Sequence, residues 1–146
     1  MNTQPYSSGK SIGSLLNKAS VIAVIGLSSN PWRTSNHIGD YLKKNNFRII
    51  PVNPNEETVL GEKSFDSMSD LPDDLEIDVV NIFRNKKHTA EVLRDIIEWS
   101  RKTGQKPLIW TQLDVSSDEA KTLAEENGFD YVENRCLMVE HSRLQN

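Results

Sequence analysis

The segment Gly26–Ser35, GLSSNPWRTS, combines one glycine, short hydroxyl and amide side chains and an arginine directly after an apolar run. A glycine permits a tight exit from a strand. A helix that begins near Ser35 would point its free N–H groups and its positive dipole end into the same space. Together with the fixed charge of Arg33, these features predict an anion site suited to a pyrophosphate. The alternative is a plain strand-to-helix turn with a solvated arginine.

Two observations weigh against a dinucleotide such as NAD at this site. The usual fingerprint, G-x-G-x-x-G, has three glycines, whereas this segment has one. Dinucleotide enzymes also place an acid at the end of the second strand, where it binds the ribose hydroxyls. Here the chain reads Val52-Asn53-Pro54-Asn55, and no acid comes before Glu56. Asn53 and Pro54 form instead a stiff, extended corner with an amide side chain available.

Basic side chains gather after the apolar runs that we interpret as strands. They are Arg33, Arg84, Lys86, Lys87, His88 and Arg135. A cleft lined by one sign of charge attracts a polyanion. Arg84 is the stronger candidate because it directly follows the run that ends in Phe83, whereas Lys86 and Lys87 also fit a simple solvated loop.

The other residues that could do chemistry predict neither a metal site nor a catalytic set. The three histidines, which lack the spacing of metal ligands, are His37, His88 and His141. Cys136 is either a nucleophile or the commoner buried, inert thiol. Trp32 lies in the anion segment, where it would cover a ligand or its entrance, while Trp99 and Trp110 are expected in the core or at its edge.

These residues can meet only if the apolar runs before them form a parallel sheet. The runs are Val21–Ile25, Ile49–Val52, Ile77–Phe83, Leu108–Trp110 and, more weakly, Tyr131–Val132. Continuous β-branched runs suit strands that are covered on both faces, and alternation with helices implies right-handed crossovers. We therefore expect a single α/β, Rossmann-like domain of three layers, with a doubly wound, mainly parallel sheet of about five strands. Ligands bind such sheets beyond the carboxyl ends of the strands, where the strand order reverses.

Helical spacing and cap residues place the helices between the runs. The expected helices are a short one through Ile12, Leu15 and Leu16, one after a Thr34-Ser35 cap, one from Ala90 to near Gly104, one between the capping-box pattern Ser116–Glu119 and Gly128, and one over Leu137–Leu144. The segment Glu56–Pro72 fits a short hairpin or a surface excursion with one helical turn. Met1–Gly9 is polar and expected to fray, so we divide the chain into a lead-in, residues 1–19, and a domain, residues 20–146.

Length and composition limit the class of protein. The 146 residues suit one domain, and a single cysteine excludes a disulfide framework or a thiolate metal cluster. With 17 Lys and Arg against 21 Asp and Glu, the net charge of −4 argues against nonspecific nucleic-acid binding. No apolar stretch has the length of a signal-peptide core or a membrane span. We therefore expect a soluble, cytoplasmic protein with no nucleic-acid or membrane partner.

Six segments, taken in their order and spacing, resemble the small stand-alone CoA-binding proteins. That family is similar to the amino-terminal CoA-binding domain of the succinyl-CoA synthetase alpha subunit. The segments are VIAVIGLSSNPWRTS, RIIPVNPN, VLGEKSF, DVVNIFR, IWTQLDV and NRCLMVEHSRL. The resemblance covers about Ser20 to Leu144. Two positions depart from the family pattern, which commonly has Pro at Thr34 and Gly at Asp114. An acid at the second position would repel phosphate if it faced the ligand.

The resemblance implies a domain that binds coenzyme A at the carboxyl edge of the sheet, with the diphosphate in the segment Gly26–Ser35. The residues that it assigns to the ligand are Gly26, Ser28, Ser29, Asn30, Arg33, Thr34, Ser35, Asn53, Pro54, Phe83, Arg84, Thr111, Gln112 and Asn134. Of these, Thr111, Gln112 and Asn134 would lie near the pantetheine or the phosphates. The resemblance brings no catalyst, because the phosphorylated histidine of the synthetase lies outside this domain and none of the three histidines matches it.

The leading hypothesis is a non-catalytic module that binds CoA or an acyl-CoA as a small-molecule ligand. One alternative is an NAD(P)-linked reductase or a CoA-dependent transferase component, which only fold analogy favours. Another is a regulatory or assembly subunit, whose protein partner the sequence does not name. A mixed disulfide between Cys136 and the CoA thiol is chemically possible.

Overall fold

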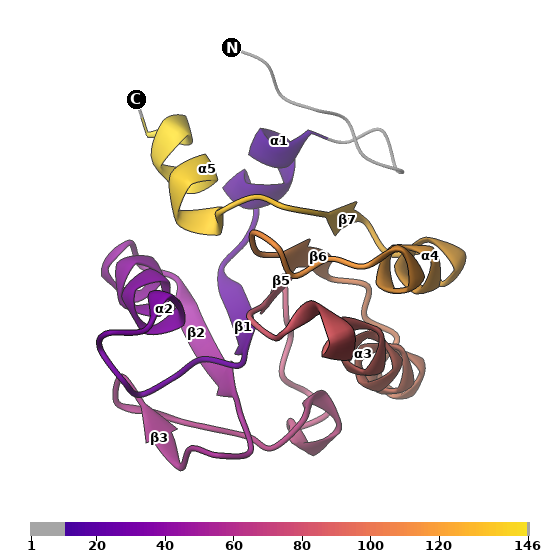
Figure 1. Ribbon diagram of the computed structural model, residues 1–146, viewed down its shortest axis with the longest axis horizontal. Helices are drawn as coiled ribbons and strands as arrows, with labels where there is room; N and C mark the ends of the chain where they lie inside the picture. Colours follow the sequence, from indigo (N-terminus) through magenta and orange to yellow (C-terminus); the bar gives the residue numbers. More distant parts are fainter. Residues whose placement is uncertain (1–10, 146) are drawn as a thin grey trace.

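The computed structural model describes residues 11–145 and shows one parallel sheet between two layers of helices (Figure 1). The strands lie in the order β2-β1-β5-β6-β7, and every neighbouring pair is parallel. They are β1 (Val21–Ile25), β2 (Arg48–Val52), β5 (Val79–Ile82), β6 (Leu108–Thr111) and β7 (Tyr131–Val132). The predicted α/β fold is confirmed, although β5 is shorter at both ends than the run Ile77–Phe83. The fraying expected of Met1–Gly9 concerns residues outside the described part.

Helices cover both faces of the sheet (Figure 1). On one face lie α1 (Ile12–Asn17), α2 (Thr34–Lys44) and α5 (Leu137–Leu144), and on the other lie α3 (Thr89–Thr103) and α4 (Asp118–Glu126). The remaining elements are the 3-10 turns η1 (Met68–Asp70) and η2 (Lys86–His88) and a hairpin of β3 (Thr58–Val59) with β4 (Glu62–Lys63). In this part of the chain, no helix has the length and apolar character needed to cross a membrane.

The sequence of β1 explains why apolar runs predicted the sheet. Ile22 and Val24 pack into the core beneath α2 and α5, while Ala23 and Ile25 pack into the core beneath α3 and α4. Successive side chains of a strand point to opposite faces of the sheet. A strand that is buried on both faces is therefore apolar at every position, without the alternation of a half-exposed strand.

The segment Glu56–Pro72 contains both structures that the sequence left open, the hairpin β3-β4 and the turn η1. The turn is anchored to α3, because the Asp95 carboxylate accepts hydrogen bonds from the Met68 N–H and the Ser69 hydroxyl, each 2.9 Å long. Met68 and Leu71 are buried in the same core as the inner face of α3. The excursion thus covers an end of that core instead of lying free on the surface.

Two helices begin differently from the predicted caps. The N-cap residue of α2 is Arg33, whose side chain makes no capping bond. The Ser35 hydroxyl instead accepts from the Ser28 N–H, at 3.1 Å. The N-cap residue of α4 is Ser117, one residue after the Ser116 that a capping box would use. The start of α2 matters for function, because the first N–H groups of an uncapped helix remain available.

The strand order reverses between β1 and β5. From β1 the chain passes through α2 to β2 on one side, and from β2 it crosses to β5 on the other side of β1. The helices that follow β1 and β5, α2 and α3, cover opposite faces of the sheet. The loops after these two strands therefore diverge. Open parallel sheets bind ligands in the crevice that such a divergence leaves, which directs attention to Gly26 and Phe83.

A buried histidine joins α5 to α2. Nδ1 of His141 lies 2.8 Å from the Tyr41 hydroxyl, and the imidazole packs edge-on against Phe47 with ring centroids 5.1 Å apart. Burial lowers the pKa of His141 below its ordinary value of 6.5, because the charged imidazolium loses hydration. The unfolded chain therefore takes up this proton at a higher pH than the folded protein does.

We expect the free energy of unfolding to fall between about pH 7.5 and 5.5, and His141→Gln to reduce that fall. The unfolded state binds more protons in this range, so stability is lost as the pH drops below the unfolded pKa. Urea unfolding at the two pH values measures the effect. His37→Gln, which changes an exposed histidine on α2, is the matched control. Equal pH dependence in the two variants would contradict the prediction.

Candidate functional site

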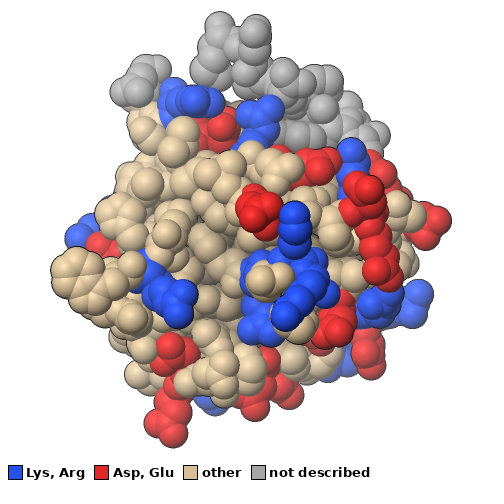
Figure 2. Space-filling model, in the orientation of Figure 1, with Lys and Arg blue, Asp and Glu red and all other residues tan. Residues whose placement is uncertain are grey.

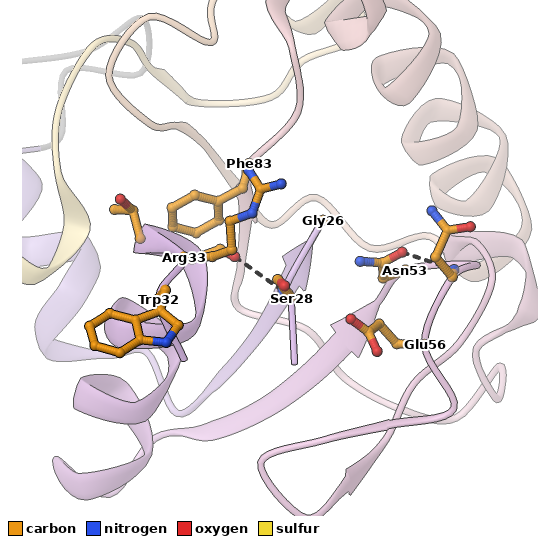
Figure 3. Close-up of a pocket in the computed structure, with 10 residues that line it drawn as sticks. Gly26, Ser28, Trp32, Arg33, Asn53, Glu56 and Phe83 are labelled. Carbon is orange, nitrogen blue, oxygen red and sulfur yellow. Dashed lines mark hydrogen bonds between the residues drawn. The ribbon is translucent and has the colours of Figure 1, made fainter. Parts of the chain in front are cut away.

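A cavity of about 660 Å³ opens at the carboxyl edge of the sheet, at the start of α2 (Figure 3). The loop after β1 and the turn after β2 supply its other walls. Its lining residues are Gly26, Ser28, Trp32, Arg33, Thr34, Ser35, Asn53, Asn55, Glu56 and Phe83. The structure thus brings much of the predicted anion segment together with Asn53 and Phe83.

Gly26 holds the end of β1 against the end of β5. Its N–H donates to the Val52 carbonyl at 2.9 Å, and its φ is 84°. A Cβ atom at this position would lie 2.1 Å from the Phe83 carbonyl oxygen. Residues with a Cβ rarely adopt this φ. Glycine is therefore required twice, for the backbone conformation and for the close approach.

The loop after β1 satisfies several of its N–H groups with its own side chains. The Ser28 N–H donates to Oγ of Ser35 at 3.1 Å, and the Asn30 N–H donates to Oγ of Ser28 at 3.0 Å. The Trp32 N–H donates to Oδ1 of Asn30, also at 3.0 Å. These hydroxyl and amide side chains therefore order the loop through hydrogen bonds to its own backbone.

Two of the donors that remain lie at the start of α2. Among the described residues, the N–H groups of Thr34 and Ser35 donate to no acceptor. Arg33 lies beside them, next to Trp32 (Figure 3), and makes no ion pair within residues 11–145. Free N–H groups at a helix N-terminus, the helix dipole and a guanidinium all favour an anion. The cavity thus presents one preformed anion site.

Glu56 lies on the opposite wall of the cavity (Figure 3). Its Oε2 accepts from the Ser29 N–H at 2.8 Å and from the Ser29 hydroxyl at 2.9 Å. These two hydrogen bonds lower the pKa of Glu56. The turn that carries Glu56 is closed by Asn53, whose Oδ1 accepts from the Asn55 N–H and whose carbonyl accepts from the Glu56 N–H. A carboxylate of the protein therefore occupies donors of the predicted phosphate loop.

Glu56 and Asn55 are the lining residues that sequence reasoning missed. Each follows β2 closely, which was a usable signal, because the carboxyl ends of parallel strands share one edge. The fold-back of the turn onto Ser29 has no local sequence pattern. It depends on Nδ2 of Asn53, which donates to the Leu27 carbonyl at 3.0 Å across the β1–β2 boundary.

A second cavity of about 190 Å³ lies toward α3 and shares Gly26 with the first. Its other lining residues are Ile25, Val52, Pro54, Asp66, Arg84, Glu91, Val92 and Asp95. Apolar side chains form part of its wall, and three carboxylates accompany one arginine. The two arginines that the sequence assigned to one ligand, Arg33 and Arg84, therefore lie in adjoining cavities at the switch point.

The basic residues do not form one continuous patch. Figure 2 shows Lys and Arg side chains gathered near the centre of this face, with Asp and Glu close by. Nζ of Lys86 lies 3.5 Å from Oδ1 of Asp114, and Nη1 of Arg135 lies 3.5 Å from Oε2 of Glu140. Such pairing reduces the field that these bases project. Arg33 and Arg84, by contrast, line the cavities and take part in no ion pair among the described residues, so their charges remain available to an anion.

Thr111, Gln112 and Asn134 line neither of these two cavities. The Thr111 hydroxyl donates to the Val132 carbonyl at 2.8 Å and joins β6 to β7. Oδ1 of Asn134 accepts from the Asp114 N–H at 3.2 Å. Gln112 is buried, and its Oε1 has no partner among the described residues. Contact between these three residues and a ligand stays a prediction.

Asp114 adopts a backbone conformation that would suit the glycine which the family resemblance leads us to expect at this position. Its φ is 60°, in the left-handed region where aspartate is one of the tolerated side chains. Its exposed carboxylate lies near Lys86 and lines neither cavity described above. The repulsion of phosphate that was expected if this acid faced the ligand therefore has no basis at these cavities.

The remaining candidates take different places. Trp99 and Trp110 are 1% and 0% exposed in the core, as predicted, whereas Trp32 is 93% exposed at the edge of the larger cavity. Cys136 is a free, half-buried thiol at the N-cap of α5. Residues 11–145 assemble no group of three side chains that could hold a metal ion.

Comparisons with known proteins identify the family and support the fold. The family model described as CoA binding domain matches residues 20–142. The chain is 31% identical to the uncharacterized protein YneT of Bacillus subtilis (strain 168), over 90% of this chain and 92% of that one. A solved structure of a hypothetical protein from Pyrococcus horikoshii OT3 is similar with a TM-score of 0.84 and 34% identity, over 100% of this chain and 99% of that one. A solved structure from Thermus thermophilus is similar with a TM-score of 0.81 and 30% identity, over 90% of this chain and 94% of that one.

Gly26→Ala should lower the free energy of unfolding by at least about 3 kcal/mol, because it adds both left-handed strain and a collision with the Phe83 carbonyl. Gly104→Ala is the matched control. Gly104 also has a positive φ, of 77°, but a Cβ there meets nothing within 4 Å. Gly104→Ala should lower the free energy of unfolding by about 1–2 kcal/mol, from backbone strain alone. Urea unfolding of both variants gives the comparison, and equal losses would disprove the collision.

Proposed function

Because the chain belongs to the CoA binding domain family, we propose that it binds CoA or an acyl-CoA through the diphosphate and adenosine portion at the carboxyl edge of the sheet. The anion site at the start of α2 carries this proposal. There the free N–H groups of Thr34 and Ser35 and the guanidinium of Arg33 meet in a cavity at the switch point. Phosphate groups bind at such helix N-termini because N–H groups and the dipole both stabilise negative charge.

The two adjoining cavities suit the two ends of the nucleotide. With a phosphate at Arg33, the adenine reaches the smaller cavity, where Ile25 and Val52 offer apolar surface. The guanidinium of Arg84 in that cavity can stack on a base or pair with a phosphate. The pantetheine arm would then leave past Phe83, toward the end of β6.

We propose binding without catalysis because the two serine hydroxyls that line the larger cavity serve the backbone. Oγ of Ser28 and Oγ of Ser35 each accept from a loop N–H group. A hydroxyl nucleophile is activated by an adjacent base, and the lining residues in the described chain place no histidine beside either serine. A protein partner fits this role, and co-purification from extract with and without CoA would detect a partner that responds to the ligand.

One observation favours NAD(P) as a second candidate ligand. Glu56 follows β2 and lines the cavity, which is where dinucleotide enzymes place the acid that binds the ribose hydroxyls. Its Oε2 is engaged by Ser29, however, and the loop after β1 has one glycine. Calorimetry with CoA, acetyl-CoA, NAD and NADP separates the candidates. Tighter binding of NAD than of CoA would reverse their order.

Arg33→Ala should weaken CoA binding by about 1.5–3 kcal/mol, the scale of a hydrogen bond to a charged group. Isothermal titration calorimetry measures the loss. Trp32 supplies an independent readout, because the other two tryptophans are buried and its emission therefore reports on the cavity.

Arg48→Ala is the matched control for this variant. Arg48 is exposed at the first residue of β2, at the opposite edge of the sheet, and its loss should leave the affinity unchanged. Equal affinity of wild type and R33A would remove Arg33 from the site. Failure of every CoA species to bind at micromolar concentration would overturn the proposed function.

A further inference from the structure

Glu56 occupies donors of the loop that is expected to hold the diphosphate. Its Oε2 accepts from both the N–H and the hydroxyl of Ser29, at 2.8 and 2.9 Å. Ser29 belongs to the loop after β1, the segment that is expected to hold the diphosphate. The N–H groups of such loops contact the phosphate oxygens in nucleotide-binding folds. In this structure the carboxylate takes the place of such an oxygen.

The donors on either side of Ser29 are already bonded within the loop. The neighbouring N–H groups of Ser28 and Asn30 are bonded to serine hydroxyls, and the free donors, on Thr34 and Ser35, lie at the start of α2. The loop after β1 and the start of α2 therefore offer two anion positions with different occupancy, of which the one at Ser29 borders the cavity through Glu56. The position at α2 is open, and the position at Ser29 is filled by Glu56.

We propose that Glu56 is a specificity-determining residue, which occupies the second anion position and which a ligand diphosphate must displace from Ser29. This inference rests on the proposed function, because it concerns the same cavity. It implies that a monophosphate binds at α2 without disturbing Glu56. A diphosphate exchanges with the carboxylate, which moves into solvent.

Two further features support an exchange. Glu56 is half-buried and takes part in no ion pair among the described residues, so no cation is stranded when its side chain turns away. While it remains on Ser29, its charge repels a second phosphate that enters the cavity. The carboxylate thus opposes a diphosphate by occupying the donor and by its charge.

Glu56→Gln should raise the affinity for ADP and for CoA by about three- to tenfold, since it removes one like charge at a contact distance. The affinity for AMP should change by less than about twofold, because its single phosphate binds at α2. Glu57→Gln removes the same charge from the next, exposed residue and is the matched control. Calorimetry of wild type, E56Q and E57Q with AMP, ADP and CoA measures these ratios. Glu56→Ala, which removes the carboxylate and its hydrogen bonds together, should give the same gain if E56Q folds poorly.

The outcomes separate this inference from the proposed function. If ADP and CoA bind the wild type, but E56Q binds them no more tightly than E57Q does, the role of Glu56 is wrong and the binding function stands. If E56Q gained as much affinity for AMP as for ADP, the role of Glu56 would also be wrong. The lost charge would then affect the attraction of any phosphate and not only of the second one. If neither wild type nor E56Q binds ADP or CoA, both the proposed function and the role of Glu56 are wrong.

Discussion

The fold and the site both depend on the close approach of Gly26 to the Phe83 carbonyl. At this point β1 and β5 lie side by side and then lead to helices on opposite faces of the sheet. A side chain at Gly26 would press into the β5 backbone. It would separate the two strands at the position where both cavities meet. One glycine therefore maintains the sheet and also opens the crevice in which a ligand is expected.

A loop with one glycine is compatible with a phosphate site because side chains satisfy several of its N–H groups. In a glycine-rich loop, exposed N–H groups face the ligand directly. Here Ser28, Asn30 and Ser35 accept these hydrogen bonds and order the loop in advance. The donors left for an anion include those of the α2 start and the Arg33 guanidinium. This arrangement explains why the absence of the fingerprint weighs against a dinucleotide and not against every phosphate ligand.

The strands could be predicted because burial on both faces makes each of them apolar throughout. The end of α3 could be predicted because a helix often ends at a glycine, and Gly104 adopts the positive φ that such an end requires. The general location of the site followed from the parallel sheet. The sequence could not predict that Arg33 and Arg84 lie in two different cavities, because their positions depend on which helix covers which face of the sheet. The pairing of Lys86 with Asp114 and of Glu56 with Ser29 likewise joins residues far apart in the sequence. Composition and spacing carry no information on such contacts.

The net charge of −4 is compatible with an anionic ligand because screening makes the field at a site local. Within the larger cavity, the charged side chains are Arg33 on one wall and Glu56 on the other. If a ligand phosphate replaces the Glu56 carboxylate on Ser29, that N–H group remains bonded before and after binding. The loop then needs no refolding, and the ordering cost that usually opposes association is small. An internal carboxylate can thus lower the affinity for a diphosphate and still preserve the geometry that binds it.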